Sequence, residues 1–320
     1  MPMIKDKTVA VTDCDHKDMK EEEAVFARCG LNLDLFQCKT EQELMDTLPG
    51  YPAVLNQYAP FTEKVFAALP DLKLIVRYGV GVNNIDLDAA SRHKVSVCSV
   101  PDYGIQEVAG HAFALMMALT RKLLPMGAAV KAGRWDYAES IPLFRYREMT
   151  VGIIGLGRIG SFFAELIRPL GCRILGFDIA DGVCGPDFVE SVDFGALIKE
   201  SDVISIHSNL ETSRHLIGKA QLADMKPTAC LVNVSRGGII DEAALADALN
   251  RGALAGAGID VTETEPLPAG SPLRTAKNII LTPHMAWYSE EASSDLKTKA
   301  AEEAARYLTG RPLKNQVNCF

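Results

Sequence analysis

TVGIIGLGRIGSFFAELIRPLGCRILGFD, at residues 150–178, is the stretch on which the fold of this chain depends. It begins with an apolar run typical of a buried strand, passes through glycines at 155, 157 and 160, and then shows a helical pattern that ends at Gly171. A second strand pattern follows and ends at Asp178. Strand, glycine turn, helix and strand in this order form the context in which G-x-G-x-x-G predicts a dinucleotide-binding unit.

Each part of this motif has a physical task in binding a dinucleotide. Gly155 permits the tight turn, Gly157 lets the backbone approach a pyrophosphate, and Gly160 lets the helix pack closely on the strand. The backbone amides at the start of the helix would then bind the phosphates. Asp178 is placed to accept hydrogen bonds from the adenosine ribose, and its charge would repel a ribose 2′-phosphate. The sequence therefore predicts NAD rather than NADP.

Length and composition predict a two-domain protein of the cytoplasm. The 320 residues exceed one average domain, and 48% hydrophobic residues are enough to fill two cores. A net charge of −8 argues against nucleic acid as a partner. No apolar run is long enough for a membrane span, and the first residues lack the apolar segment of a signal peptide. The 8 cysteines are scattered without C-x-x-C, which fits reduced thiols and predicts no metal site.

Strand and helix patterns alternate on both sides of the dinucleotide motif. In residues 1–100, Asp18 is expected to cap the first helix, and a capping box at residues 40–43 starts another. Such alternation predicts parallel sheets with helices on both faces. A long helix, apolar on nearly all sides, is predicted at residues 106–124 and is expected to lie between domains or subunits. Residues 125–147 are interpreted as a connecting loop with short helical turns.

Polar residues follow several predicted strands, at the edge where open parallel sheets bind ligands. They are Arg77, His207, Arg236, Asp260 and His284, with Glu265 a few residues after one strand. An arginine can hold a carboxylate in two hydrogen bonds, and a histidine can exchange a proton with a carbonyl oxygen during hydride transfer. A carboxylate on the other ring nitrogen fixes the histidine tautomer. This combination predicts the reduction of a 2-oxo acid.

Three of these segments resemble the signatures of the D-isomer-specific 2-hydroxyacid dehydrogenases. They are NVSRGG at 233–238, DVTETEP at 260–266 and TPH at 282–284. The resemblance covers essentially the whole chain. It implies that Arg236 binds the substrate carboxylate and carbonyl, that His284 is the acid/base, and that Glu265 pairs with His284.

The same resemblance implies the domain organisation and the oligomeric state. It predicts an α/β protein in which a Rossmann-type NAD-binding domain, residues 101–286, is inserted into a flavodoxin-like substrate-binding domain, residues 1–100 and 287–320. Both domains would be doubly wound parallel sheets. The helix at 106–124 would form the interface of a homodimer.

Further site residues are implied by resemblance to the family's substrate loop and cofactor contacts. RYGVG at 77–81 is similar to the substrate loop, in which the amides of Val80 and Gly81 would hold the carboxylate; Arg77 and Trp287 would line the pocket. The residues assigned to the cofactor are Gly155, Gly157, Arg158, Ile159, Gly160, Asp178, His207, Ser208, Val234, Ser235, Asp260 and His284.

PHMAWYSE at 283–290 looks like the C-terminal-binding-protein branch, whose members are eukaryotic transcriptional corepressors. Val80 replaces a more polar residue of that branch, and the loop after His207 is one residue shorter than usual. The first hypothesis is an NAD-dependent D-2-hydroxyacid dehydrogenase (EC 1.1.1.-). The alternatives are an NAD(H)-sensing scaffold protein with incidental turnover and a phosphoglycerate dehydrogenase.

Overall fold

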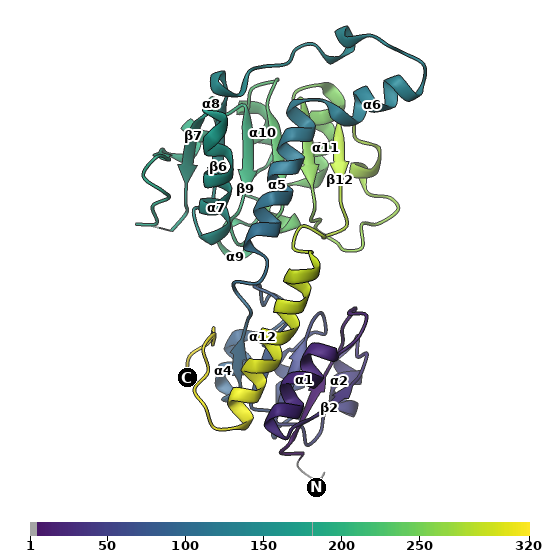
Figure 1. The fold of residues 1–320 in the computed structure, drawn as a ribbon, viewed down its shortest axis with the longest axis vertical. Coiled ribbons are helices and arrows are strands. Elements are labelled where there is room, and N and C mark those ends of the chain that lie inside the picture. The colour runs from purple at the N-terminus through teal and green to yellow at the C-terminus, as the bar shows by residue number, and fades with distance from the viewer. Residues whose placement is uncertain (1–4, 181) are drawn as a thin grey trace. The chain divides into compact units, whose positions relative to one another are not determined.

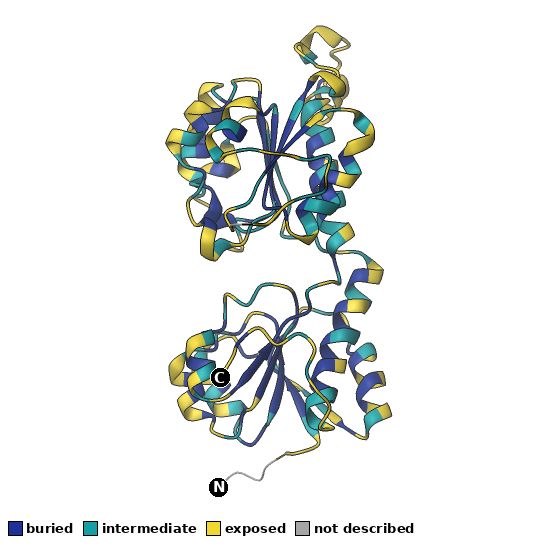
Figure 2. Cartoon of the chain, turned by 90° about the vertical axis from the view of Figure 1, so that its left-hand side faces the viewer, coloured by how far each residue is buried: buried dark blue, intermediate teal, exposed yellow. Residues whose placement is uncertain are grey.

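The chain is divided into two compact units. The computed structural model describes residues 5–180 and 182–320. The first four residues, which belong to the segment predicted to lack a signal peptide, lie outside this description. One unit comprises Met1–Gly104 and Ser289–Phe320, and the other comprises Ile105–Tyr288. The second unit is thus inserted in the sequence of the first. Each is a sheet whose central strands are buried between more exposed helices (Figures 1 and 2).

The first unit is built on a five-stranded sheet in which every pair of neighbours is parallel. Its strands are β1 (Thr8–Val11), β2 (Asn32–Leu35), β3 (Ala53–Asn56), β4 (Leu74–Arg77) and β5 (Ser96–Cys98), in the order β2-β1-β3-β4-β5. Its helices are α1 (Lys20–Cys29), α2 (Glu41–Thr47), α3 (Glu63–Ala68), α4 (Leu87–Arg92) and α12 (Glu290–Leu308). α2, α3 and α4 pack on one face of this sheet and share its core, and α1 and α12 pack together on the other face.

The C-terminal segment belongs to this first sheet although it follows the inserted unit in sequence. α12 packs on β3 and β4. Beyond the helix, the backbone amide of Val97 donates a hydrogen bond to Asn318 Oδ1 at 2.8 Å, which ties the last residues to β5. Both ends of the chain therefore build one unit, as expected for an inserted domain.

Helix capping follows one prediction and contradicts another. The capping box is confirmed: Glu43 N donates to Thr40 Oγ1 at 3.3 Å, and Thr40 N donates to Glu43 Oε2 at 3.1 Å. The predicted Asp18 cap is wrong, because Met19 occupies the N-cap position of α1. Asp18 lies one residue too early. Its carboxylate accepts a long hydrogen bond from Lys20 N at 3.4 Å and is paired with the amino groups of Lys20 at 2.8 Å and Lys297 at 3.3 Å.

The second unit is built on a seven-stranded parallel sheet. Its strands are β6 (Thr150–Ile154), β7 (Arg173–Phe177), β8 (Glu190–Ser191), β9 (Val203–Ile206), β10 (Cys230–Asn233), β11 (Gly256–Ile259) and β12 (Ile279–Leu281), in the order β12-β11-β10-β9-β6-β7-β8. Its α-helices are α5 (Ile105–Thr120), α6 (Leu123–Lys131), α7 (Arg158–Ile167), α8 (Phe194–Glu200), α9 (Leu210–Ser213), α10 (Lys219–Asp224) and α11 (Glu242–Arg251). Its 3-10 turns are η1 (Tyr137–Ser140), η2 (Tyr146–Glu148), η3 (Arg168–Leu170), η4 (Gly237–Ile239) and η5 (Pro272–Thr275).

Two separate cores fill the two faces of this sheet. α5 and α7 pack against each other on one face, and α8, α10 and α11 cover the other. The strand order changes direction at β6 and β9, so the carboxyl ends of these neighbours form the switch point where doubly wound sheets bind ligands. The predicted α/β class with doubly wound parallel sheets is confirmed.

The long apolar helix is broken where the sequence predicted continuity. α5 ends at Thr120, Lys122 adopts the left-handed conformation with φ 51°, and α6 then starts at Leu123. The prediction of a single helix to residue 124, followed by a loop from residue 125, is therefore wrong for residues 121–131. Pro125 explains the start of α6, because proline lacks an amide hydrogen and is tolerated in the first turn of a helix.

Among the residues described, no single helix is long and apolar enough to cross a membrane. α5 and α6, bent by 56°, meet the criterion only as a pair, by length and composition.

Candidate active site

The glycine turn after β6 is held by direct backbone packing. At Gly160 a Cβ would lie 1.9 Å from the carbonyl oxygen of Gly155, so α7 approaches the turn more closely than any side chain permits. Gly155 has φ 93°, and a Cβ there would lie 2.6 Å from the backbone of His207. In contrast, a Cβ at Gly157, the N-cap of α7, would meet no described atom within 4 Å. The helix start therefore faces open space, which fits a pyrophosphate.

Replacing Gly160 with alanine should test this close packing. The added methyl would force α7 away from the turn, and we expect a loss of about 1–3 kcal/mol in the free energy of unfolding, together with weaker NADH binding. Gly110→Ala in α5 is the matched control, because a Cβ there meets nothing within 4 Å and alanine gains about 1 kcal/mol in a helix. Denaturant unfolding and NADH titration measure both effects. Equal stability of the two variants would contradict the packing explanation.

Asp178 and the end of β9 complete the surroundings of the turn. Asp178 follows β7 and accepts hydrogen bonds from Leu156 N at 2.7 Å and from Ala180 N at 3.0 Å, so its carboxylate is fixed beside the glycines. At the end of β9, His207 Nδ1 and Ser208 Oγ are buried without a hydrogen-bond partner among the residues described. Unsatisfied buried polar atoms are costly, so their position fits a polar ligand such as NAD.

His207 is held as a neutral ring at this edge. Its Nε2 lies 2.9 Å from Ser205 Oγ, and its ring centroid lies 5.0 Å from that of Phe163. Burial lowers the pKa of His207 to about 3, since a charged imidazolium would lose its hydration there. A neutral imidazole can pack beside a ligand but cannot act as a proton donor near neutral pH. His207 therefore fits the predicted cofactor contact better than a catalytic role.

His284 and Glu265 form a direct pair near the carboxyl ends of β11 and β12. His284 Nδ1 lies 2.6 Å from Glu265 Oε2, while Glu265 Oε1 accepts a hydrogen bond from Thr262 N at 3.0 Å. Burial alone would raise the pKa of Glu265, but the hydrogen bond and charge of His284, the Thr262 amide and the charge of Arg236 together lower it. Glu265 is thus held as a carboxylate, and His284 Nε2 has no hydrogen bond to any described residue.

Asp260 holds the loop that carries His284. Its Oδ1 accepts hydrogen bonds from Thr282 Oγ1 at 2.6 Å and Met285 N at 3.0 Å, and its Oδ2 accepts one from Ala286 N at 2.9 Å. His284 itself has φ 52°, a conformation that non-glycine residues rarely adopt. The buried Asp260 carboxylate therefore fixes this backbone. The sequence assigned Asp260 only to the cofactor, and its positioning of the His284 loop was missed.

His111 was also missed as part of this surrounding network. It lies on α5, and its Nε2 is 3.1 Å from Thr282 Oγ1 and 3.7 Å from Asp260 Oδ1. The contact connects the long helix to the loop of His284. The TPH segment was the available signal that Thr282 adjoins the histidine, but no pattern in the sequence indicated that residue 111 would reach it.

Arg236 is brought to the same region by the glycine that follows it. A Cβ at Gly237 would lie 1.9 Å from the backbone carbon of Thr262, so the two loops are in backbone contact. Arg236 is extended at the N-cap of η4, where Asn233 Nδ2 donates to its carbonyl oxygen at 2.9 Å. The Arg236 loop therefore adjoins the loop of Glu265 and His284. The structure brings together the three residues predicted for catalysis.

The remaining predicted site residues of the second unit lie at the start of α7, directly after β10 and shortly after β12. Arg158 and Ile159 form the first turn of α7. Val234 is buried, which leaves its backbone as the available contact, and Ser235 Oγ donates to Ile206 O at 2.8 Å. The ring centroid of Trp287 lies 5.5 Å from that of Tyr288.

Three predicted substrate residues belong to the first unit. Arg77 is the last residue of β4, the side chain of Val80 is 48% exposed, and Gly81 is partly buried in the same loop. Their roles remain predictions.

Known proteins similar to this chain cover most of its length. Residues 113–286 match the model of the D-isomer specific 2-hydroxyacid dehydrogenase, NAD binding domain. A D-3-phosphoglycerate dehydrogenase of Synechocystis sp. is 38% identical over 87% of this chain, and a glyoxylate reductase of Korarchaeum cryptofilum is 38% identical over 81% of this chain and 80% of its own length. The chain spans 51% of the Synechocystis protein, about half its length.

Solved structures agree with these relatives. The D-lactate dehydrogenase of Aquifex aeolicus, complexed with NAD and lactic acid, matches 94% of this chain and 96% of its own with a TM-score of 0.85 and 27% identity. The glycine turn, Asp178 and the open start of α7 fit the cofactor named by the matching domain model. The chain therefore belongs to the D-isomer specific 2-hydroxyacid dehydrogenase family, a family of NAD-dependent oxidoreductases.

Proposed function

We propose that this protein interconverts a 2-oxo acid and the corresponding D-2-hydroxy acid by hydride transfer with NAD(H). The observation that carries the proposal is the His284–Glu265 pair, with the Arg236 loop in backbone contact beside it. A 2-oxo acid has a ketone next to a carboxylate. A histidine paired with a carboxylate can exchange a proton with the ketone oxygen, and a guanidinium can bind the substrate carboxylate. In this proposal, residues 101–286 bind NAD, and residues 1–100 with 287–320 bind substrate.

Each of the three residues has a distinct task. Arg236 binds the substrate carboxylate and polarises the carbonyl through its planar fork of donors. Bound NADH supplies the hydride. His284 gives its Nε2 proton to the carbonyl oxygen in reduction and accepts a proton there in oxidation. Glu265, held as a carboxylate, keeps the Nδ1 proton of His284 toward itself and therefore leaves Nε2 directed to the substrate.

Further substrate contacts are assigned to two segments. Arg77, Val80 and Gly81 would supply a guanidinium and backbone amides to the carboxylate, and Trp287 would supply a pocket wall. The exposed side chain of Val80 supports a backbone role, because its methyl groups offer no hydrogen bond.

A panel of 2-oxo acids tests the reaction and its specificity. NADH oxidation should be followed with glyoxylate, hydroxypyruvate, phosphohydroxypyruvate, phenylpyruvate and a longer aliphatic 2-oxo acid. The relatives named for phosphoglycerate, glycerate and glyoxylate support the first three as candidates. Turnover of at least one is expected, with a D-configured product for every substrate except glyoxylate, whose product glycolate is achiral. No turnover with any of them, while NADH still binds, would contradict the proposal and favour the alternative of an NAD(H)-sensing binding protein.

We also propose that the protein is a cytoplasmic homodimer, and the exposed apolar residues after α5 support the dimer. Exposed large side chains are concentrated between residues 123 and 144, on α6 and the segment that extends from it (Figure 1). They are Leu123, Leu124, Val130, Trp135, Tyr137, Ile141 and Phe144. A concentration of this kind marks an interaction surface rather than ordinary scatter. It overlaps the end of the predicted helix at 106–124 at Leu123 and Leu124, and it continues beyond that helix.

Charged residues on this surface should separate the subunits. The double variant Leu124→Asp/Trp135→Asp removes apolar side chains that are 56% and 88% exposed, so we expect a shift from dimer to monomer in light scattering after size exclusion. Leu35→Asp is the control, because Leu35 is 48% exposed on β2, outside this segment. A wild-type monomer, or an unchanged dimer in the double variant, would contradict the assigned interface.

A further inference from the structure

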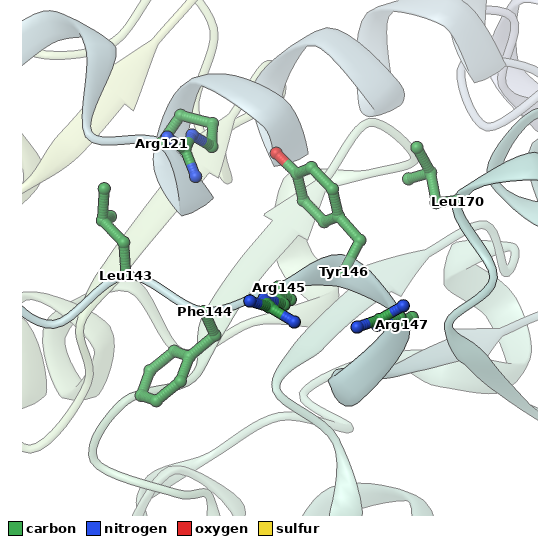
Figure 3. A pocket seen from close by; sticks show the side chains of 7 residues that line it. All are labelled: Arg121, Leu143, Phe144, Arg145, Tyr146, Arg147 and Leu170. Atoms are coloured by element: carbon green, nitrogen blue, oxygen red, sulfur yellow. The ribbon is translucent and has the colours of Figure 1, made fainter.

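We propose that a hollow at the amino end of β6 binds a small organic polyanion, an anion with more than one carboxylate or phosphate. The hollow has a volume of about 410 Å³ and is lined by Arg121, Leu143, Phe144, Arg145, Tyr146, Arg147 and Leu170 (Figure 3). This site contains none of the three proposed catalytic residues, but it shares Phe144 with the surface proposed above for the dimer. The glycine turn follows the carboxyl end of β6, whereas the hollow adjoins residues that precede its first residue, Thr150. Five strand residues, about 16 Å, separate the two.

One contact brings the three arginines together. Tyr146 Oη lies 3.3 Å from Thr120 Oγ1, which connects η2 to the end of α5. Arg121 directly follows Thr120, and Arg145 and Arg147 directly flank Tyr146. Figure 3 shows Arg121 on one side of the hollow and the other two arginines across from it. The juxtaposition is therefore built by the packing of the tyrosine.

The positive charge of this cluster is little compensated within the chain. Arg121 and Arg145 have no carboxylate within ion-pair distance among the residues described, and Arg147 Nε has only Glu148 Oε1 at 3.4 Å, with both side chains exposed. The whole chain, in contrast, carries a net charge of −8. Three arginines that line one hollow with so little acidic compensation favour an anionic ligand, and their planar forks match carboxylate and phosphate oxygens.

The size and walls of the hollow indicate the class of anion. A volume of about 410 Å³ lies in the range of small-molecule sites. It exceeds what a single inorganic ion fills. Leu143 and Leu170 add apolar wall to the three cations. A carbon body with several anionic groups satisfies both features, whereas an uncharged ligand would leave the arginines unmatched.

Calorimetric titration of the full chain with citrate, and separately with inorganic pyrophosphate, tests the site and separates carboxylate from phosphate ligands. We expect one binding event per chain for at least one probe. Arg121→Gln/Arg145→Gln should weaken it by about tenfold or more, since two charge-assisted contacts are lost. Lys219→Gln/Lys277→Gln changes two exposed lysines of the same unit that lie outside the 123–144 surface. It removes the same charge and should leave the affinity nearly unchanged.

Three results would overturn the site. They are no binding of either probe with an unchanged oligomeric state in the arginine variant, equal weakening in both double variants, and no binding of either probe together with a shift to monomer in the arginine variant. The last result would mean that acidic groups of a second copy occupy the hollow. Far-UV circular dichroism of both variants distinguishes a lost ligand contact from a lost fold.

Discussion

Replacing Arg236 with glutamine is expected to lower kcat/KM for the best 2-oxo acid by about 10³-fold, while NADH affinity stays near that of the wild type. The side chain is the only one of the three proposed catalytic groups that can hold a carboxylate and polarise a carbonyl together. Glutamine keeps much of the length but offers one amide in place of the charged fork, so the loss falls on substrate orientation and on the transition state. Steady-state kinetics and NADH fluorescence titration measure the two quantities.

A matched arginine separates this effect from a general loss of charge. Arg251 lies on α11 of the same unit and is paired with Asp247 at 2.8 Å on an exposed helix face. Arg251→Gln should therefore leave kcat/KM within about twofold, as expected for a surface ion pair worth less than about 1 kcal/mol. Wild-type kcat/KM in Arg236→Gln would remove Arg236 from the reaction.

The order of strands and helices was largely predictable because both local signals and periodicity agreed. The glycine turn, the capping box at Thr40 and the strand at 203–206 each have a short-range cause, and the structure has them in place. The break between α5 and α6 was not predictable from periodicity, since apolar residues continue on both sides of it. Pro125 was the only local signal.

The Asp18 cap failed for a different reason. Its residue type suited an N-cap, but the N-cap of the helix lies one residue later, at Met19, and the carboxylate also pairs with Lys297, far away in the chain. A tertiary contact of this kind cannot be read from local sequence.

In the candidate site, too, local motifs predicted some features, and others depend on tertiary packing. Arg236, Glu265 and His284 were predictable because each belongs to a short motif at a strand end, and parallel strands end at a common edge. The motifs did not show how the residues are held. Gly237 was visible as part of a motif, but its backbone contact with Thr262 depends on the packing of two loops. The reach of His111 to Thr282 depends on the placement of a whole helix.

His284→Asn is expected to lower kcat by about 10²–10⁴-fold, with NADH binding retained. Asparagine tolerates the left-handed backbone that His284 adopts at φ 52°. Its amide lies where Nδ1 lies and can still donate to Glu265, but nothing replaces the proton at Nε2. The substitution therefore removes proton transfer and keeps the local structure. Wild-type kcat would exclude His284 as the acid/base.

His215→Asn is the control for this variant, because His215 also has φ 52° and lies 3.7 Å from the carboxylate of Glu263. It lies outside the proposed site, so kcat should be unchanged.

The lowered pKa of Glu265 adds a second readout for the pair. Because the folded-state pKa lies below the unfolded value of about 4.3, the pair stabilises the fold at higher pH, and this contribution is lost as the pH falls through the folded-state pKa. His284→Asn removes the charge that lowers this pKa. The difference in unfolding free energy between wild type and variant should therefore narrow below about pH 4. If the difference in unfolding free energy does not change with pH, the Glu265–His284 charge pair does not stabilise the fold. The loss of kcat in His284→Asn would then need an explanation that does not involve this pair.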